Sequence, residues 1–210
     1  MLWIIPAITV SYIVGSIPTA YIFAHLLKGI DIRKFGSGNV GATNAWRVLG
    51  KPVGISVLIL DILKGFIPVI FLGDFLGSRI NFADKTILPI LLGLSCICGH
   101  NWTLFLRFKG GKGIATTLGV LIGLSMKIAE LRLILVLLII TWVFIFALAR
   151  IISIASVLTS ILLPVYTVIF RQSKVIISLS ILLCVFSILR HLTNIKRIIQ
   201  GKESRLTFKK

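Results

Sequence analysis

Long apolar runs dominate this sequence of 210 residues, and most of them approach the length that a helix needs to cross a lipid bilayer. A membrane span takes about 20 mainly apolar residues, or somewhat fewer where neighbouring helices bury it. Hydrophobic residues make up 57% of the chain, and its mean hydropathy is +1.06. Soluble domains of this length are less apolar. The sequence therefore predicts an all-α integral membrane protein.

On this template we expect a bundle of seven transmembrane helices in one domain that covers residues 1–210. The expected spans are 2–27, 53–77, 86–106, 113–126, 132–149, 152–170 and 175–190. The third and fourth are the weakest, because a polar segment cuts into both and the fourth is short. An even number of spans is the main alternative. The first span lacks the basic start of a secretory signal, so we expect it to be uncleaved.

Three polar segments that contain glycine interrupt the apolar runs, and we call them the first, second and third strips. They are GSGNVGATNAWR at 36–47, GHNWTLFLRFKGGKGIAT at 99–116 and RHLTNIKRIIQGKES at 190–204. Seven spans would bring all three strips to the same side of the membrane, where they can form one site.

The distribution of Lys and Arg predicts which side this is, because cytoplasmic loops are enriched in basic residues. The side with the strips has sixteen basic residues, the opposite side has six, and Lys64 falls inside the second span. The six on the opposite side are Arg79, Lys85, Lys127, Arg132, Arg171 and Lys174. We therefore expect the N-terminus outside the cell and the strips and C-terminus in the cytoplasm.

A formal net charge of +17 predicts anionic partners. The basic residues lie between apolar runs and not in one stripe, and the motifs of nucleic-acid-binding proteins are missing. Several of them stand beside glycines, whose backbone N–H groups can approach an anion closely. We therefore expect membrane lipid and a phosphate-bearing substrate as partners, and no nucleic acid.

Two motifs resemble nucleotide-binding fingerprints but fail in their context. GSGNVG in the first strip has the glycine spacing of a dinucleotide site, and Asp61 lies about 20 residues beyond it. A membrane span precedes these glycines, however, where the motif requires a strand. GGKG in the second strip resembles a Walker loop, but Gly113 follows Lys112 where Ser or Thr is required. Since no His, Cys, Asp and Glu set has metal-site spacing either, we expect no metal and no cofactor.

Asp61 and Lys64 lie three residues apart on one helical face of the second span, where a lone charge costs about 2.5 to 3.5 kcal/mol. We expect them to pair and to face the interior of the bundle, and a structural role is favoured over a catalytic one. Small residues four apart also predict tight helix contacts. These pairs are Gly50 with Gly54, Gly73 with Gly77 and Gly119 with Gly123.

Together, the three strips resemble the motifs of the bacterial acyl-phosphate glycerol-3-phosphate acyltransferase family, PlsY, in the same order and with similar spacing across essentially the whole chain. Trp102 and Thr103 stand where Pro or Ser is frequent, and Ile198 replaces a common Leu. The resemblance implies transfer of a fatty acyl group from acyl phosphate to the 1-hydroxyl of glycerol 3-phosphate. The products would be lysophosphatidate and phosphate, made at the cytoplasmic face of the bacterial inner membrane without an obligatory protein partner.

In the first strip, we expect Ser37 and Arg47 to contact phosphate, since Ser is a neutral donor and Arg a bidentate one. Asn39, Thr43 and Asn44 are expected to hold the loop together and to contribute to substrate binding.

In the second strip, we expect Gly110, Gly111 and Gly113 to expose backbone N–H groups to the acyl phosphate, and Lys112 to neutralise its charge. Arg107 and Lys109 can instead contact lipid headgroups. His100 is expected to be structural.

In the third strip, His191 and Asn194 would share a helix face if the seventh span continues inward, and they form the expected catalytic pair. His191 would accept the hydroxyl proton and Asn194 would orient the acceptor, although a phosphate on either substrate could equally be the base. Ser153, with Ser156, either completes the phosphate site or caps its helix. Glu203 is expected to pair with an Arg or Lys of a loop.

The main alternative function is a transporter or flippase of a phosphorylated metabolite or lipid, because basic loops and an intramembrane ion pair also suit translocation. The sequence lacks the repeated halves and the matched pair of interrupted helices that many transporters have. The acyltransferase interpretation is therefore favoured.

Overall fold

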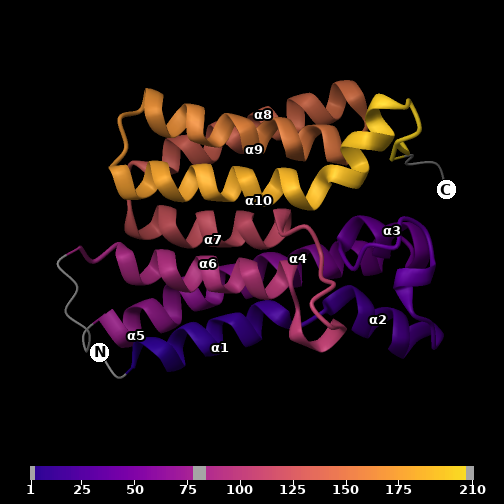
Figure 1. The fold of residues 1–210 in the computed structure, drawn as a ribbon, viewed down its shortest axis with the longest axis horizontal. Helices are drawn as coiled ribbons and strands as arrows, with labels where there is room; N and C mark the ends of the chain where they lie inside the picture. Colours follow the sequence, from indigo (N-terminus) through magenta and orange to yellow (C-terminus); the bar gives the residue numbers. More distant parts are fainter. Residues whose placement is uncertain (1–2, 78–83, 207–210) are drawn as a thin grey trace. The chain divides into compact units, whose positions relative to one another are not determined.

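The computed structural model describes residues 3–77 and 84–206, and these residues form helices and loops without a strand (Figure 1). The expected all-α architecture is confirmed for this part of the chain. Its contacts divide it into two compact units, Met1–Lys127 and Ile128–Lys210, which we call the N-terminal unit and the C-terminal unit. One domain over residues 1–210 stays a prediction.

The N-terminal unit contains the first two strips and the helices that flank them. Its elements are α1 (Ile4–Ser16), α2 (Thr19–Lys28), η1 (Ile32–Lys34), α3 (Ala42–Leu49), α4 (Lys51–Ile67), η2 (Pro68–Leu72), α5 (Gly73–Gly77), α6 (Ile87–Asn101), η3 (Leu104–Leu106) and α7 (Ile114–Lys127). α1 packs against α6, and α4 packs against both α3 and α7.

A proline breaks the first expected span, 2–27, into two helices. The residue before a proline is driven out of the helical conformation, and Ile17, which precedes Pro18, has φ −56° and ψ 113°. α2 therefore continues at an angle of 41° to α1. Gly29 then ends α2 with a left-handed φ of +63°, which glycine adopts without a steric penalty.

Five segments of the described chain are long and apolar enough to cross a membrane, and α1 with α2 makes a sixth if the bent pair is one span. The five are Lys51–Gly77, Ile87–Leu106, Leu131–Ala149, Ile152–Ile169 and Lys174–Ile199. The span expected at 113–126 appears as α7, an apolar helix of 14 residues. A count of seven spans stays a prediction.

The prediction of tight packing at small residues is confirmed for Gly54, Gly119 and Gly123. At each of them an added Cβ would collide with a neighbour, and beside Gly119 this neighbour is the backbone carbonyl of Ile62 in α4. The prediction is wrong for the other three glycines, which have open space or ordinary contacts: Gly50, Gly73 and Gly77. Equally close approaches join α1 and α6, because an added Cβ on Gly15 or Gly99 would collide with backbone atoms of the other helix.

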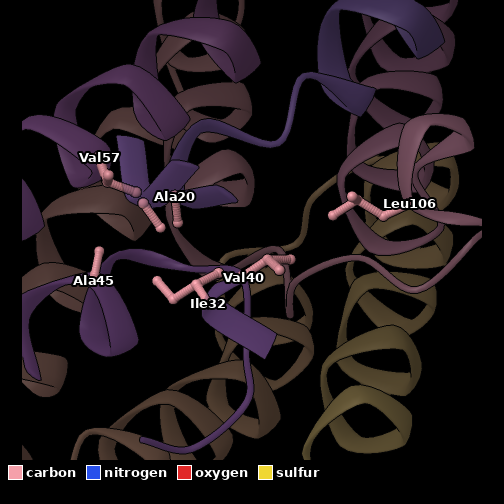
Figure 2. Close-up of a cluster of buried hydrophobic side chains, with 7 residues drawn as sticks. Ala20, Ile32, Val40, Ala45, Val57 and Leu106 are labelled. Carbon is pink, nitrogen blue, oxygen red and sulfur yellow. The ribbon is translucent and has the colours of Figure 1, made fainter. Parts of the chain in front are cut away.

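A hydrophobic cluster of the N-terminal unit contains side chains from both of its strips (Figure 2). Val40 and Ala45 come from the first strip, Leu106 from the second, and Ile32 from the loop before the first. All four are at most 5% exposed. Ala20, Ala24 and Val57 complete the cluster. Because one cluster buries residues of both strips, the two strips lie at the same end of this unit.

The C-terminal unit contains three helices within the described residues: α8 (Leu131–Ala149), α9 (Ile152–Ile169) and α10 (Lys174–Ile199). α9 packs against both of the others. Buried hydroxyls add to this packing, as where Thr167 Oγ1 lies 2.9 Å from Ser180 Oγ. α10 runs well past residue 190, where the last expected span ends, and so carries most of the third strip on a helix.

Candidate functional site

Asn44 organises the first strip. It lies fully buried in the first turn of α3. Its Oδ1 accepts a hydrogen bond from the backbone N–H of Ser37 at 2.8 Å, and its Nδ2 donates to the carbonyls of Ile32 at 3.3 Å and Phe35 at 3.1 Å. A side chain at Gly36 would collide with Oδ1. One amide therefore holds the loop ahead of α3 together, as expected for Asn44.

The other residues predicted in the first strip are more accessible than Asn44. Ser37, Asn39 and Thr43 are half-buried, and Arg47 is exposed in the last turn of α3. The strip thus presents a hydroxyl and a guanidinium on a rigid segment. Their contact with phosphate stays a prediction.

A charged pair fixes the chain between α2 and the first strip. Asp31 accepts hydrogen bonds from the backbone N–H of Arg33 at 3.0 Å and from its guanidinium Nη2 at 2.7 Å. These bonds lower the pKa of Asp31 to about 2. The guanidinium also lies 5.4 Å from the centre of the Tyr21 ring, in cation–π geometry. Because Asp31 already compensates the charge of Arg33, we do not expect this guanidinium to bind phosphate.

The glycines of the first strip lie in a different context from those of a dinucleotide-binding turn. Helix α2 precedes them where that motif requires a strand. Asp61, which has the spacing of the ribose-binding acid, is 1% exposed in the middle of α4.

The second strip folds back onto the end of α6. The backbone N–H of Gly110 donates to the carbonyl of Asn101 at 3.2 Å, and that of Gly111 donates to the carbonyl of His100 at 3.0 Å. The expectation that both N–H groups face phosphate is therefore corrected, because each stabilises the loop itself.

Lys112 and the start of α7 offer a positive charge and backbone donors at the end of this loop. α7 begins at Ile114, and the N–H groups of a first helical turn have no partner within the helix. Gly113 precedes it with φ +77°, a conformation that favours glycine. Lys112 is half-buried beside it. This combination of a cation with a helix N-terminus suits a phosphate group.

A buried polar cluster lies beneath the second strip. Asp61 Oδ1 contacts Lys64 Nζ at 2.8 Å, accepts a hydrogen bond from Thr19 Oγ1 at 2.5 Å and lies 3.9 Å from His100 Nδ1. Lys64 Nζ also donates to the carbonyl of Ile17 at 2.8 Å, at the break between α1 and α2. The expected pairing of Asp61 with Lys64 inside the bundle is confirmed.

His191 and Asn194 share one buried face of α10, as the continued helix requires, and they are 2% and 5% exposed. His191 Nδ1 lies 2.8 Å from the backbone carbonyl of Ser187. A carbonyl only accepts, so Nδ1 carries the proton of this bond, and the lone pair of the neutral ring is on Nε2.

Glu203 joins Asn194 to Ser153, and its role was not expected from the sequence. Its Oε1 accepts hydrogen bonds from Asn194 Nδ2 at 2.5 Å and from Ser153 Oγ at 2.7 Å. The side chain is 6% exposed, and Arg197 Nε lies 3.9 Å from Oε2. The expected pairing with a basic residue is therefore the weaker of its contacts. The sequence feature that could have indicated this role is that Glu203 is the only acidic residue in a strongly basic strip.

The serines at the start of α9 do not cap it. Ser153 donates its hydroxyl to Glu203, and Ser156 Oγ accepts from Trp142 Nε1 at 3.2 Å. The backbone N–H of Leu206 donates to the carbonyl of Arg150 at 2.8 Å, which returns the tail to the turn between α8 and α9. Of the predicted residues in this unit, the structure thus brings Ser153 and Asn194 together.

Comparison with known proteins shows the family of this chain. The family pattern described as glycerol-3-phosphate acyltransferase matches residues 5–201. A protein named glycerol-3-phosphate acyltransferase from Fusobacterium nucleatum subsp. nucleatum is 37% identical over 201 residues, which are 96% of this chain and 97% of the relative.

Two solved structures of PlsY (YgiH), an integral membrane glycerol 3-phosphate acyltransferase, are similar in fold. Its glycerol 3-phosphate form has a TM-score of 0.84 at 34% identity, and the match covers 97% of this chain and 96% of that chain. Its lysophosphatidic acid form has a TM-score of 0.81 at 33% identity, with coverage of 97% and 95%. The chain therefore belongs to the glycerol-3-phosphate acyltransferase family.

Proposed function

We propose that this enzyme transfers a fatty acyl group from acyl phosphate to the 1-hydroxyl of glycerol 3-phosphate. Family membership supports acyl transfer to glycerol 3-phosphate. The observation that carries the choice of donor is the loop at 110–113, where Lys112 and the start of α7 offer positive charge and N–H donors. An acyl phosphate presents its phosphate directly next to the reacting carbonyl.

The reaction can proceed without a covalent enzyme intermediate. The 1-hydroxyl oxygen attacks the acyl carbonyl carbon, a new ester C–O bond forms, and the C–O bond to phosphate breaks. Inorganic phosphate leaves with the bonding electron pair, and the hydroxyl proton passes to a base. Because phosphate is a good leaving group, the enzyme mainly supplies alignment and charge compensation.

Lys112, Gly113 and the first turn of α7 bind the phosphate of the donor. The ammonium of Lys112 neutralises charge on the leaving group, and Gly113 lets the backbone come close to it. Gly110 and Gly111 contribute by shaping this loop through their bonds to the end of α6.

Ser37 and Arg47 bind the phosphate of glycerol 3-phosphate. Arg47 can hold two oxygens at once, and Ser37 donates one hydrogen bond from its neutral hydroxyl. Asn44 supports both by closing the loop between them. Asn39 and Thr43 belong to the same loop and complete it.

His191 is the base, and Asn194 orients the acceptor. The bond from Nδ1 to the carbonyl of Ser187 leaves the basic nitrogen at Nε2. Glu203 fixes the amide of Asn194 with its Nδ2 toward the carboxylate, and Ser153 donates to the same oxygen. A phosphate of either substrate as the base is the alternative that a His191 variant tests.

The membrane arrangement we propose is a single domain with seven spans in the bacterial inner membrane. In it, α1 with α2 forms one broken span and α7 a short one. The N-terminus is outside and the strips and C-terminus are cytoplasmic, as the excess of basic residues on that side supports. Three residues of the charge count lie outside the described residues: Arg79, Lys209 and Lys210.

The decisive experiment gives the purified protein glycerol 3-phosphate and either a long-chain acyl phosphate or the matching acyl-CoA, without added metal or nucleotide. Lysophosphatidate is expected with acyl phosphate, and acyl-CoA is expected to be a poor donor. Comparable rates with acyl-CoA would contradict the donor assignment. Uptake of glycerol 3-phosphate into proteoliposomes without lysophosphatidate would instead favour the transporter.

A further inference from the structure

His100 lies between the second strip and the buried pair of Asp61 and Lys64. It is 7% exposed at the end of α6, and its Nδ1 is 3.9 Å from Asp61 Oδ1. That oxygen is held in place by Lys64 at 2.8 Å and by Thr19 at 2.5 Å. The carboxylate is thus fixed from two helices, α2 and α4, and gives one edge of the imidazole a rigid neighbour.

The other edge of the His100 ring lies against Gly111. A Cβ on Gly111 would collide with ring atoms Nε2 and Cε1, so the Cα of this glycine rests on the imidazole. The backbone of His100 holds the same residue, because its carbonyl accepts the N–H of Gly111 at 3.0 Å. Lys112 follows directly in the chain, so the position of Gly111 limits where the lysine can reach.

The three glycines of the loop lack a side chain for different reasons. Gly113 has φ +77°, which disfavours any side chain. A Cβ on Gly110 would meet backbone atoms of His100 and Asn101. Gly111 has no positive φ, and the nearest obstacles to its Cβ are atoms of the His100 ring. Only at Gly111 does the imidazole exclude the side chain.

We infer that His100 is a positioning residue for the donor-phosphate loop, with Asp61 as its buried support. The ring fixes the distance between the backbone of Gly111 and the end of α6. It thereby directs Lys112 toward the phosphate of the acyl donor, without touching the reacting atoms. The expected effect on KM for acyl phosphate rests on the proposed function. The expected effect on the placement of the loop does not depend on that function.

The first test is a single substitution in the full-length protein in detergent micelles. His100→Ala is expected to raise KM for acyl phosphate by about tenfold, with kcat and KM for glycerol 3-phosphate within about twofold of wild type. Ser95→Ala is the matched control on the same helix, since it removes a hydrogen bond of 2.7 Å to the carbonyl of Ile8 but does not contact the loop. An equal rise of both KM values, or a fall in kcat alone, would overturn the inference.

The second test is a double-mutant cycle. Gly111→Ala alone is expected to raise KM for acyl phosphate, but His100→Ala vacates the space of its methyl group. The double variant should then have a KM no higher than either single variant. Gly110→Ala serves as the control, because its obstacle is backbone and its effect should multiply with that of His100→Ala. Multiplicative effects in both cycles would overturn the inference.

Trypsin cleavage after Lys112 reports the position of the loop without any activity. His100→Ala should accelerate this cleavage severalfold relative to wild type and Ser95→Ala, and Gly111→Ala in the same background should slow it again. If His100→Ala does not fold, His100→Gln takes its place in the same comparison. Absence of lysophosphatidate from wild type would refute the proposed function alone, whereas an unchanged cleavage rate would refute the positioning role.

Discussion

Each unit buries one carboxylate next to a strip, and the two carboxylates differ in what compensates them. Asp61 in the N-terminal unit has an ammonium at 2.8 Å and a hydroxyl at 2.5 Å on one oxygen. Glu203 in the C-terminal unit accepts from an amide and a hydroxyl, and its nearest cation, Arg197, is 3.9 Å away. The charge of Asp61 is compensated by Lys64 inside the fold. Glu203 instead accepts hydrogen bonds from two residues that are proposed to act on the substrate, Asn194 and Ser153.

The role of a buried acid depends on the groups that contact its oxygens. A closed ion pair holds helices together and tends to be replaceable by apolar residues of similar size. A carboxylate that holds polar side chains of a site instead orients them, since hydrogen bonds to a charged group are stronger than neutral ones. We therefore expect substitutions at Asp61 to act mainly on stability, with an effect on KM for acyl phosphate through His100, and substitutions at Glu203 to act on turnover.

The largest effect is expected at His191, the proposed base. His191→Ala should lower kcat by about 10²- to 10⁴-fold, as removal of a general base does, with little change in either KM. Steady-state assays of lysophosphatidate formation measure this, with Leu192→Ala as a control at an exposed position of α10. Full turnover in His191→Ala would contradict this role and would indicate that a phosphate of one of the substrates is the base.

Next in size is the loss of the Asp61 carboxylate. Asp61→Asn leaves Lys64 buried without its counter-charge and should cost about 3 to 5 kcal/mol of stability. Thermal unfolding in micelles should show the loss, and the double variant Asp61→Leu/Lys64→Met should recover most of it. If the double variant is as unstable as the single one, the pair does more than compensate charge.

A smaller effect is expected at Glu203. Glu203→Ala removes two hydrogen bonds to a charged acceptor, each of about 1.5 to 3 kcal/mol, and should lower kcat by at least about tenfold. Glu203→Gln keeps an oxygen at this position and should retain more activity than the alanine variant. A large loss of stability with unchanged turnover would place Glu203 in the same class as Asp61.

The smallest effect is expected in the first strip. Ser37→Ala removes one hydrogen bond from a neutral hydroxyl to the charged acceptor phosphate, worth about 1.5 to 3 kcal/mol, and should raise KM for glycerol 3-phosphate by about 10- to 150-fold. Its KM for acyl phosphate should stay close to wild type. A change in the donor KM of equal size would mean that the first strip does not serve the acceptor alone.

Much of this arrangement follows from patterns that act over one or two helical turns. The pairing of Asp61 with Lys64 was predictable because their spacing of three fixes them on one face. His191 and Asn194 were predictable in the same way. The loop closure by Asn44 also agrees with its sequence context, since the amide reaches only its own strip.

Contacts that join distant segments were not predictable. The bond from Ser153 to Glu203 links residues 50 apart, and nothing in either segment specifies the other. The N–H groups of Gly110 and Gly111 were predicted to bind phosphate, but they donate to the end of α6. This return of the loop onto α6 is a tertiary contact that the sequence of the strip does not specify. The break at Pro18 was not predicted, because the first span was taken from hydropathy alone and extends across this residue.

The most direct test of the account is the stoichiometry of the purified wild-type enzyme with acyl phosphate and glycerol 3-phosphate. Lysophosphatidate and inorganic phosphate should appear in equal amounts, both should require glycerol 3-phosphate, and both should fall together in His191→Ala. Phosphate release that exceeds lysophosphatidate, or that proceeds without glycerol 3-phosphate, would contradict direct acyl transfer to the acceptor.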